Sequence, residues 1–448
     1  MRLQGILEFK QRYDWAGSLI MDIRIVKPIQ GGAVNVIASK SQAHRLLICA
    51  ALADNETFIA CRTTSQDIDA TTRCLEALGA VVQRKPDGFF VTPIKQRAKS
   101  QGTEYIELDC GESGSTLRFL LPVCGAFGFR VSFTMSGRLP ERPLCALYDE
   151  MVSHGCILSE PGSSRLRCEG RLKNGAYTLP GNISSQYISG LLFALPLLVG
   201  DSLIRVTGAL ESRPYVDMTL DALRQFGISV YEEERQIFRI PGAQRGRSPK
   251  KACVEGDWSD AAFWLSAGAI GQNSVTCTGL NLDSQQGDRA IIELLERFGA
   301  QVSIDNDKVT VSSGGILRGI EIDAKDTPDL VPVLAAVASV AEGKTVIRNA
   351  GRLRIKESDR LRTVTASLSS LGADITETED GLIIVGKKTL TGGETESYGD
   401  HRIAMTAAVI SAVCSGPVLI KNAEAVNKSY PGFFEDFSAA LGGVCEEV

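Results

Sequence analysis

The stretch LEALGAVV at residues 75–82 has the pattern of an amphipathic helix that ends near a glycine and is followed by a strand. The same signature returns five times at spacings of 70 to 76 residues, with its glycine at Gly155, Gly227, Gly299, Gly372 and Gly442. Glycine is favoured just past a helix because it adopts the left-handed conformation without a steric penalty. A signature repeated at nearly constant spacing predicts a chain made of six copies of one α/β unit.

A second series marks the start of an apolar helix in each unit. Its anchors are spaced by 70 to 74 residues and are Ser41, Ser113, Ser185, Ser259, Asp329 and His401. Segments such as LVPVLAAVASVA (330–341) and IAMTAAVISAVC (403–414) are apolar on every side, which predicts burial all round. They are shorter than the roughly 20 residues that cross a bilayer, so we expect core helices.

The six units divide into two sets of three, which predicts two domains. Residues 39–257 form the first set, and residues 258–448 form the second set, which lacks a leading strand. The strand-like run MDIRIV at 21–26 could supply that strand, so we assign residues 1–38 to the C-terminal domain. The chain would then cross between domains near Ser39 and Asp257, and two crossings would form a hinge. Residues 1–20 are expected to lie outside the repeats.

The composition is that of a globular protein and excludes several classes. The chain has 448 residues, 44% of them hydrophobic, which is enough for two or more cores. A net charge of −5 is not typical of a protein that binds nucleic acid or an anionic membrane. Twelve cysteines without a C-x-x-C pair and only three histidines predict no zinc site. The charged first twenty residues do not resemble a signal peptide, so we expect a reduced, cytoplasmic protein.

Polar motifs gather at the starts of the apolar helices, where unpaired N–H groups and the helix dipole favour anions. A helix cap explains any one of them. Capping does not require a cation beside the cap, however, and Lys40, Arg45 and Arg402 recur there. The motifs lie at 39–45, 111–115, 184–186, 327–329 and 399–402.

Further cations precede the amphipathic helices, at 138–143, 212–215, 352–360 and 427–429. In an acidic protein this clustering indicates a compact anionic ligand that carries phosphate or carboxylate groups. Glu357 and Asp329 are the acid/base candidates because each lies among these cations. Ion pairing for Glu357 and a first-turn helix position for Asp329 explain the two carboxylates equally well.

Several strings in order resemble one enzyme family. They are ASKSQAHR, GESGSTLR, RLPERP, SSQ, SRPY, VEGDWSDAA, RIKESDRL, GDHR-x-AM and NKSYPGFF. Over about residues 22–441 the chain resembles the 5-enolpyruvylshikimate-3-phosphate synthases (3-phosphoshikimate 1-carboxyvinyltransferases). The resemblance implies a two-domain inside-out α/β barrel with three βαβαββ units per domain and an active site in the interdomain cleft.

The same resemblance implies the reaction and the residues that carry it. The enolpyruvyl group of phosphoenolpyruvate passes to the 5-hydroxyl of shikimate 3-phosphate, phosphate is released, and no cofactor or metal is needed. The implied catalytic residues are Asp329, Glu357 and Lys40. Shikimate 3-phosphate would contact Lys40, Ser41, Arg45, Ser184, Ser185, Gln186, Ser212, Tyr215, Asp329 and Lys356. Phosphoenolpyruvate would contact Lys40, Gly114, Arg138, Gln186, Arg360, Arg402 and Lys428.

The chain departs from the family pattern at two positions and in the loop before Arg138, which is shorter than usual. Glu112 stands where the family commonly has asparagine, and Arg352 stands where some members have an asparagine that contacts the shikimate phosphate. A carboxylate beside an anionic substrate is unfavourable unless a cation compensates it. We therefore expect Glu112 to pair with a cleft arginine and to weaken binding of glyphosate, an inhibitor that mimics phosphoenolpyruvate.

Two other functions stay open at this point. UDP-N-acetylglucosamine enolpyruvyl transferases share the fold and chemistry, but they carry a reactive cysteine on a loop, and the loop at Arg138 has none. A ring-shaped DNA sliding clamp could also be built from six repeats, although its basic residues would line the ring. We expect a monomer that binds small molecules and neither nucleic acid nor membrane.

Overall fold

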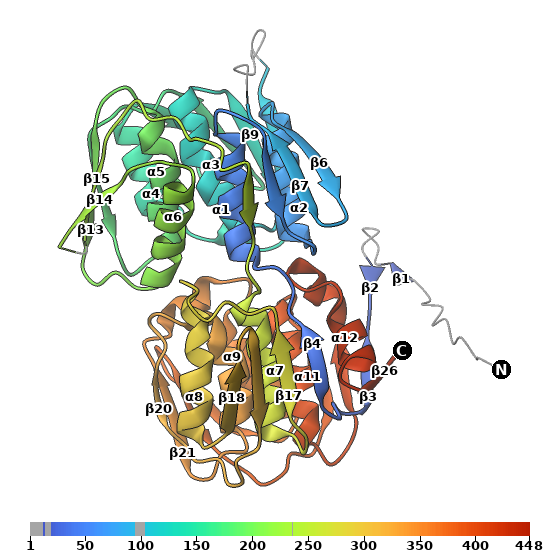
Figure 1. Ribbon diagram of the computed structural model, residues 1–448. Coiled ribbons are helices and arrows are strands. Elements are labelled where there is room, and N and C mark those ends of the chain that lie inside the picture. The colour runs from blue at the N-terminus through green and yellow to red at the C-terminus, as the bar shows by residue number, and fades with distance from the viewer. Residues whose placement is uncertain (1–11, 14–18, 95–103, 235) are drawn as a thin grey trace.

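The computed structural model describes residues 12–13, 19–94, 104–234 and 236–448. The chain forms two lobes, one above the other (Figure 1). The stretch 1–20, expected outside the repeats, falls outside the described residues except for the short strands β1 (Arg12–Tyr13) and β2 (Leu19–Ile20).

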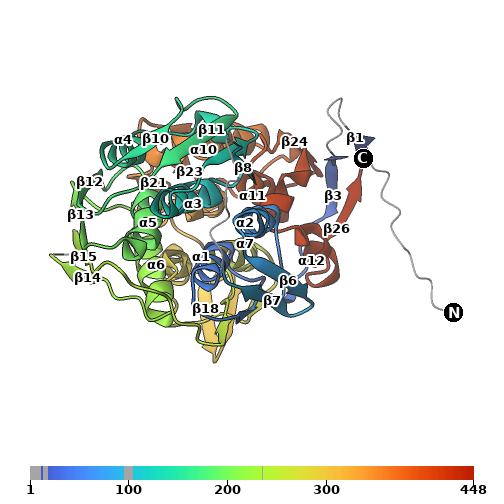
Figure 2. The ribbon, with the colours of Figure 1, turned by 90° about the horizontal axis from the view of Figure 1, so that it is seen from above.

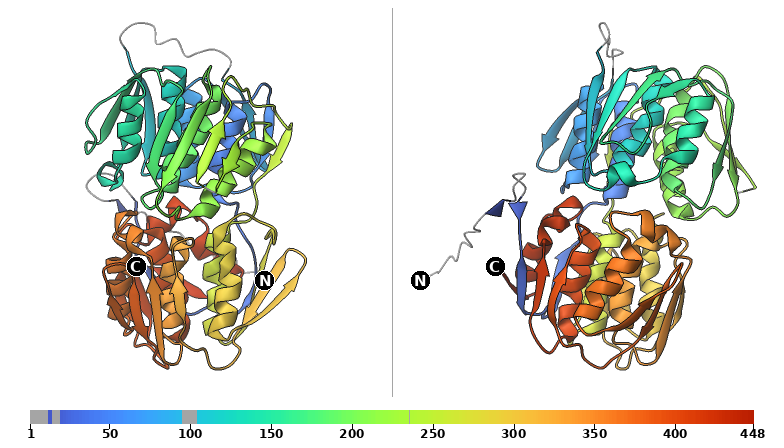
Figure 3. Two further views of the ribbon diagram at one scale, coloured as in Figure 1. Left: turned by 90° about the vertical axis from the view of Figure 1, so that its left-hand side faces the viewer. Right: turned by 180° about the vertical axis from the view of Figure 1, so that it is seen from behind.

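Each lobe has its own hydrophobic core. The core of the upper lobe, here called the N-lobe, draws its buried residues from Ala43 to Ala252. The core of the lower lobe, the C-lobe, combines Ile23 to Val36 with Trp258 to Leu441. Side and back views show the same division (Figure 3).

Six apolar helices form the interior of the lobes, as the second sequence series predicts. All eight residues of α9 and all ten of α11 are buried, which confirms the prediction of helices surrounded on every side. The N-lobe contains α1 (Lys40–Ala51), α3 (Gly114–Phe127) and α5 (Ser185–Ala194), and the C-lobe contains α7 (Trp258–Ile270), α9 (Val331–Ala338) and α11 (His401–Ile410). Seen from above, α1, α3 and α5 are viewed along their axes, with strands around them (Figure 2).

Six amphipathic helices alternate with the buried ones along the chain. They are α2 (Gln66–Ala77), α4 (Cys145–Ser153), α6 (Arg213–Gln225), α8 (Ile291–Phe298), α10 (Arg360–Ser370) and α12 (Phe433–Ala439). Each ends within three residues of its signature glycine, and all six glycines have φ between 68° and 104°. This left-handed conformation confirms the reason for glycine at these positions.

The described chain also forms six four-stranded sheets, each with one parallel pair, which confirms the predicted sixfold α/β organisation. The N-lobe sheets contain β5 (Thr57–Ala60), β6 (Val81–Lys85), β7 (Gly88–Thr92) and β16 (Lys251–Cys253); β8 (Ile106–Gly111), β9 (Val131–Met135), β10 (Cys156–Leu158) and β11 (Arg165–Gly170); and β12 (Ala176–Pro180), β13 (Ser202–Thr207), β14 (Tyr231–Glu233) and β15 (Ile237–Ile240). The C-lobe sheets contain β4 (Gly32–Asn35), β17 (Val275–Thr278), β18 (Gln301–Asp305) and β19 (Lys308–Ser312); β20 (Glu321–Asp323), β21 (Lys344–Arg348), β22 (Asp374–Glu377) and β23 (Leu382–Val385); and β3 (Ile23–Lys27), β24 (Gly393–Glu396), β25 (Val418–Lys421) and β26 (Val444–Glu447).

The first long strands of the chain belong to the C-lobe. Strand β3 lies between β25 and β26, and β4 pairs in parallel with β17. The two chain crossings between the lobes then lie side by side, because Ser39 N donates to Glu255 O at 2.7 Å and Asp257 N donates to Ile37 O at 2.8 Å. The lobes are therefore connected by two adjacent strands of backbone.

We predict that two alanine substitutions at signature glycines of the N-lobe separate backbone strain from crowding. A Cβ at Gly227 would meet nothing closer than 3.8 Å, so Gly227→Ala should lower the free energy of unfolding by about 1 kcal/mol from its left-handed φ alone. A Cβ at Gly155 would lie 2.9 Å from Arg171 O, so Gly155→Ala should lower the free energy of unfolding by more than Gly227→Ala does. Equilibrium urea unfolding measures both, with Gly227→Asn as the milder control. Equal losses for the two alanine variants would contradict the crowding argument.

Candidate active site

A cavity between the lobes receives the amino-terminal ends of the buried helices. Its lining includes first-turn residues of four such helices and Asp329 from the 3-10 turn η4 (Pro328–Leu330) that leads into α9. The first-turn residues are Lys40 and Ser41, Gly114 and Ser115, Ser185 and Gln186, and His401 and Arg402. Helix N-termini bear partial positive charge and unpaired N–H groups, so the cavity favours anions before any side-chain charge is counted.

The two lobes cap these helices with different residues. In the N-lobe, Ser113 Oγ accepts from Thr116 N and Ser184 Oγ accepts from Gln186 N. In the C-lobe the cap of α11 is Asp400, whose Oδ1 accepts from Arg402 N at 3.0 Å. A serine cap leaves the positive helix end uncompensated, whereas an aspartate cap neutralises it and can hold a cation. The starts of α3 and α5 are therefore more open to a ligand phosphate than the start of α11.

Asp257 caps a helix in each lobe at the chain crossing. Its Oδ1 accepts from Ser259 N at 2.9 Å in α7, and its Oδ2 accepts from Lys40 N at 3.0 Å in α1. The side chain of Ser39, the residue before α1, makes no cap hydrogen bond. One carboxylate thus links the position of Lys40 to the C-lobe.

Arg360 pairs with three carboxylates of the C-lobe. Its Nη1 lies 2.7 Å from Asp329 Oδ1, its Nη2 lies 2.7 Å from Glu357 Oε2, and its Nε lies 2.7 Å from Asp400 Oδ2. Only 2% of the Arg360 side chain is exposed. Charge-assisted bonds from one buried guanidinium fix both acid/base candidates in the same cavity.

The two candidate carboxyls are held ionised by their neighbours. Burial would raise the pKa of Asp329, but Arg402, Lys356 and Arg360 outweigh it, so this pKa lies well below its ordinary value. Burial likewise opposes the effect of Arg360, Arg142 and Lys428 on Glu357, whose pKa also lies well below its ordinary value. The cations therefore decide the charge of both groups.

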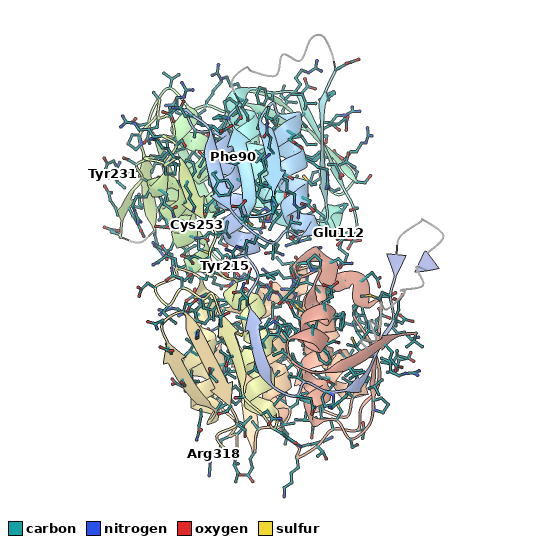
Figure 4. The ribbon with its side chains drawn as sticks, turned by 45° about the vertical axis from the view of Figure 1, so that its right-hand side comes forward. Phe90, Glu112, Tyr215, Tyr231, Cys253 and Arg318 are labelled. Atoms are coloured by element: carbon teal, nitrogen blue, oxygen red, sulfur yellow. The ribbon has the colours of Figure 1, made fainter. Side chains whose placement is uncertain are left out.

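Asp329 is also the point where a tyrosine of the N-lobe reaches the C-lobe. Tyr215 Oη donates to Asp329 Oδ2 at 2.8 Å, and Arg402 Nη2 lies 3.4 Å from the same oxygen. Lys356 Nζ lies 3.9 Å from Asp329 Oδ1, and burial lowers the pKa of Lys356 to about 8. Tyr215 is labelled at the boundary of the lobes in Figure 4.

Lys40 is paired by a carboxylate that the sequence analysis did not single out. Lys40 Nζ lies 3.1 Å from Asp67 Oδ2 in the first turn of α2. Burial would lower the pKa of Lys40, but Asp67 and Glu357 outweigh it, so the pKa is raised. The ammonium is therefore charged at neutral pH.

Hydroxyl groups and Arg45 occupy the N-lobe wall of the cavity. Ser212 has φ 52°, a left-handed conformation that is rare for serine, and its Oγ accepts from Arg352 Nη2 at 2.9 Å. Arg45 is buried and donates to Thr219 Oγ1 at 2.9 Å and Tyr215 O at 2.8 Å. These hydrogen bonds of Arg45 stabilise the N-lobe wall of the cavity.

The cavity gathers most of the residues that the sequence analysis names. They are Lys40, Ser41, Arg45, Gly114, Ser184, Ser185, Gln186, Ser212, Tyr215, Asp329, Lys356, Glu357, Arg360 and Arg402. The structure does not bring Arg138 there, because its side chain is 45% exposed and pairs with Glu141 at 3.3 Å. Lys428 also stands outside the lining and pairs with Glu112.

Two cavity arginines were missed in the sequence analysis. Arg142 Nη1 lies 3.5 Å from Glu357 Oε1, and Arg118 Nη1 donates to Gln186 Oε1 at 3.1 Å. Both lie close to Gly114, where a Cβ would come within 2.5 Å of Arg118 Nη1 and 2.8 Å of Arg142 Nη1. The string RLPERP contains Arg142 beside Arg138, so the signal was present but could not distinguish the two.

The two departures from the family pattern both make contacts between the lobes. The expected partner of Glu112 was a cleft arginine; instead, its Oε2 lies 2.7 Å from Lys428 Nζ. The reason is spatial, because Lys428 comes from a turn 316 residues further along the chain. Arg352 lines the cavity and pairs with Glu211 at 2.5 Å.

Two buried acidic groups lie near the start of α7. Burial and the neighbouring Asp257 raise the pKa of Asp260 to about 8, and burial with Asp329 raises the pKa of Asp288 to about 7. Ser259 Oγ donates to Asp288 Oδ2. Within the described ranges no group of three or more His, Cys, Asp or Glu side chains is arranged to hold a metal ion.

Fold and cavity together define a two-lobed α/β protein suited to bind small, multiply charged anions between its lobes. The sequence model of the family described as EPSP synthase (3-phosphoshikimate 1-carboxyvinyltransferase) matches residues 23–437. The chain belongs to the EPSP synthase family.

Relatives and solved structures agree with this assignment. A 3-phosphoshikimate 1-carboxyvinyltransferase of Clostridium kluyveri is 44% identical over 93% of this chain and 96% of its own length, and one of Clostridium perfringens strain 13 is 45% identical over 93% and 97%. The structure of EPSP synthase from Acinetobacter baumannii superposes with a TM-score of 0.78 at 27% identity, over 95% of this chain and all of that one. The enolpyruvyl transferase NikO from Streptomyces tendae, at 19% identity and a TM-score of 0.77, shares the fold.

These matches confirm the two-domain inside-out α/β fold and the family expected from the sequence motifs. They decide against both alternatives, the UDP-N-acetylglucosamine enolpyruvyl transferase and the DNA clamp. Among the described helices, none combines the length and apolar composition of a membrane span.

We predict that Asp260 makes stability fall as pH rises. Its pKa is about 8 in the folded chain and about 4 when unfolded, so between these values the folded state binds more protons. Asp260→Asn should therefore unfold at a higher temperature than the parent protein at pH 8 and show a weaker loss of stability from pH 5 to 8. Circular dichroism melts across this range measure the difference, with the exposed Asp283→Asn as control. Identical pH slopes for parent and Asp260→Asn would contradict the prediction.

Proposed function

We propose that the cavity between the lobes binds shikimate 3-phosphate and phosphoenolpyruvate side by side. The reaction is that of the family: the chain transfers the enolpyruvyl group of phosphoenolpyruvate to the 5-hydroxyl of shikimate 3-phosphate and releases phosphate. The product belongs to aromatic amino acid biosynthesis. The observation that carries the residue assignment is Arg360, which holds Asp329 and Glu357 in one cavity with Lys40.

Shikimate 3-phosphate binds against the N-lobe wall. Ser184, Ser185 and Ser212 supply hydroxyl groups for the phosphate, and the positive end of α5 favours its charge. Around them, the ring of the substrate meets the remaining residues of that wall and its neighbours, namely Lys40, Ser41, Arg45, Gln186, Tyr215, Asp329 and Lys356.

Phosphoenolpyruvate binds among the cations nearer the C-lobe. Arg360 and Arg402 hold its carboxylate, and Lys40 and Gln186 hold its phosphate, with Gly114 leaving room beside it. Lys428, which lies outside the cavity lining and pairs with Glu112, joins them at the phosphate once the substrate is bound. Arg142 lines the cavity and already faces Glu357, so we assign it the role that the resemblance gave to Arg138. Arg138 remains a candidate that requires movement of its loop.

Proton transfer follows from the charges around Glu357. Addition of the hydroxyl to the enol carbon requires a proton on the methylene carbon, and Glu357 donates it. Its pKa is low because cations surround it, and anionic substrates that engage Arg360, Arg142 and Lys428 weaken that effect. Burial then raises the pKa, so substrate binding itself protonates the acid.

Asp329 and Lys40 act on the other reactant. Asp329 accepts the proton of the 5-hydroxyl while Lys40 orients the oxygen and stabilises charge on the phosphate. In the second step Glu357 takes a proton from the methyl group, the C=C bond re-forms as the bond from carbon to the phosphate oxygen breaks, and Asp329 gives its proton to the departing phosphate, which restores both carboxyl groups. Cations on every side compensate the charges of the two substrates.

Lobe movement opens the cavity to the substrates. We assign residues 1–38 and 258–448 to the C-terminal domain and 39–257 to the N-terminal domain, with a hinge at the adjacent crossings near Ser39 and Asp257. Closure about this hinge excludes water from the reacting groups. The assignment is supported by the two separate cores and by the two backbone hydrogen bonds at the crossings.

The chain is proposed to act as a monomer in the cytoplasm. One chain supplies residues on all sides of the cavity, so no second copy is needed to complete it. All twelve cysteines are unpaired, as in a reducing compartment.

We predict that loss of the proton donor abolishes turnover more than binding. Glu357→Gln should lower kcat by about 10²- to 10⁴-fold while the KM for each substrate changes much less. Phosphate release with shikimate 3-phosphate as acceptor measures the effect, and UDP-N-acetylglucosamine should support no release by the parent protein. The exposed Glu379→Gln is the control. A Glu357→Gln protein with near-parental kcat would remove Glu357 from the mechanism.

We also predict that Arg142 outweighs Arg138 in binding phosphoenolpyruvate. Arg142→Ala should raise the KM for phosphoenolpyruvate by at least about tenfold, since a buried charged contact is worth roughly 1.5–3 kcal/mol. Arg138→Ala, which removes an exposed side chain, should raise it less. Steady-state kinetics with shikimate 3-phosphate held saturating compares the pair, and a larger effect of Arg138→Ala would reverse the assignment.

A further inference from the structure

The ion pair of Glu112 and Lys428 joins the lobes beside the cavity. Glu112 stands between β8 and α3 of the N-lobe, and Lys428 ends the 3-10 turn η7 (Ala423–Lys428) of the C-lobe. Glu112 Oε2 lies 2.7 Å from Lys428 Nζ. In Figure 4, Glu112 is labelled at the lower edge of the N-lobe, facing the C-lobe.

The two partners differ in their access to water. The Lys428 side chain is 7% exposed and that of Glu112 is 44% exposed. An unpaired buried ammonium is strongly unfavourable, so Lys428 needs an anion beside it at all times. A half-exposed carboxylate can turn into water at little cost. Glu112 is therefore the partner that can leave.

A glycine in the neighbouring loop leaves room for this carboxylate. Gly137 has φ 53°, and a Cβ there would lie 2.0 Å from Glu112 Oε1. Any side chain at this position would displace the carboxylate. Because Gly137, in the loop that carries Arg138, has no side chain, Glu112 can lie against Lys428.

Lys428 also belongs to the charge balance of the cavity. It lies close enough to Glu357 to favour the ionised form of that carboxyl, after Arg360 and Arg142. An anion that enters beside Glu357 therefore meets an ammonium that is already neutralised by Glu112.

We propose that Glu112 is an exchangeable counterion of Lys428. It pairs with Lys428 in the absence of substrate and is displaced when the phosphate group of phosphoenolpyruvate engages Lys428. Glu112 thereby lowers the affinity for phosphoenolpyruvate and leaves that for shikimate 3-phosphate unaffected. The inference rests on the proposed role of Lys428 as a ligand of phosphoenolpyruvate. Glu112 acts through Lys428 and is a positioning residue.

The decisive variant is Glu112→Gln, which keeps the shape and removes the charge. Its KM for phosphoenolpyruvate should fall roughly two- to fivefold, as expected for a partly exposed ion pair, and the difference should shrink in high salt. The inhibition constant of product phosphate should fall in parallel, while the KM for shikimate 3-phosphate stays constant. Glu107→Gln, which removes an exposed carboxylate from the preceding strand β8, is the matched control and should behave like the parent protein.

The remaining outcomes overturn the proposal. If Glu112→Gln leaves the KM for phosphoenolpyruvate unchanged, Glu112 does not compete with the substrate for Lys428. If Glu112→Gln raises the KM of both substrates, the ion pair instead stabilises the closed arrangement of the lobes. Lys428→Met tests separately whether Lys428 binds phosphoenolpyruvate at all. If Lys428→Met leaves the KM for phosphoenolpyruvate unchanged, the assigned role of Lys428 fails. If it raises that KM while Glu112→Gln has no effect, only the exchange fails. In the Lys428→Met background, Glu112→Gln should have no further effect.

Discussion

The convergence of buried helix ends on one cavity is the constraint around which the rest of the site is arranged. Several positive helix termini cannot face one another without compensating groups, because each presents unpaired N–H groups and part of a dipole. The chain meets this requirement differently at different helices. Ser113 and Ser184 cap α3 and α5 without adding charge, whereas Asp257 caps α1 and α7, and Asp400 caps α11, with a negative charge. The result is an asymmetric cavity made from similar units.

The aspartates of the C-lobe in turn require cations. Asp400 and Arg360 are both almost fully buried, and neither would be stable there without the other. Arg360 has further N–H groups to donate, and these reach Asp329 and Glu357. The geometry of the proposed proton-transfer groups is thus a consequence of how one helix start is capped. Stability and chemistry depend on the same side chains, so substitutions here affect both.

Local signals made most of the fold predictable from sequence. The glycine after each amphipathic helix and the uniformly apolar helices depend on neighbouring residues only, and Gly299 and α11 have the expected conformation and burial. The sequence motifs also identified the family. The boundaries of the two domains and the roles of Asp329 and Glu357 stay predictions.

Local sequence patterns could not predict contacts between segments that are distant in the sequence. Arg138 and Arg142 are separated by a short 3-10 turn, and the partner that draws Arg142 inward, Glu357, lies 215 residues further on. Asp67 beside Lys40 and Lys428 beside Glu112 are likewise set by how repeats dock, not by their own sequences. Packing of the lobes therefore decides that Arg142 rather than Arg138 lines the cavity. It also decides that a lysine, Lys428, pairs with Glu112 where an arginine was expected.

The place of β3 between β25 and β26 has a consequence for how the chain is made. This strand is synthesised before the whole N-lobe, yet both its neighbours follow roughly 400 residues later, a delay of tens of seconds at ordinary rates of translation. All strands of the N-lobe emerge in the interval, so that lobe can fold while β3 remains an unpaired edge. During this interval Ile23 and Ile25, which are buried in the folded C-lobe, have no partner strands to cover them, and only Arg24 and Lys27 add charge to the strand. The two crossing segments near Ser39 and Asp257 are synthesised well before β25 and β26, so they can pair while the C-lobe sheet that takes up β3 is still incomplete.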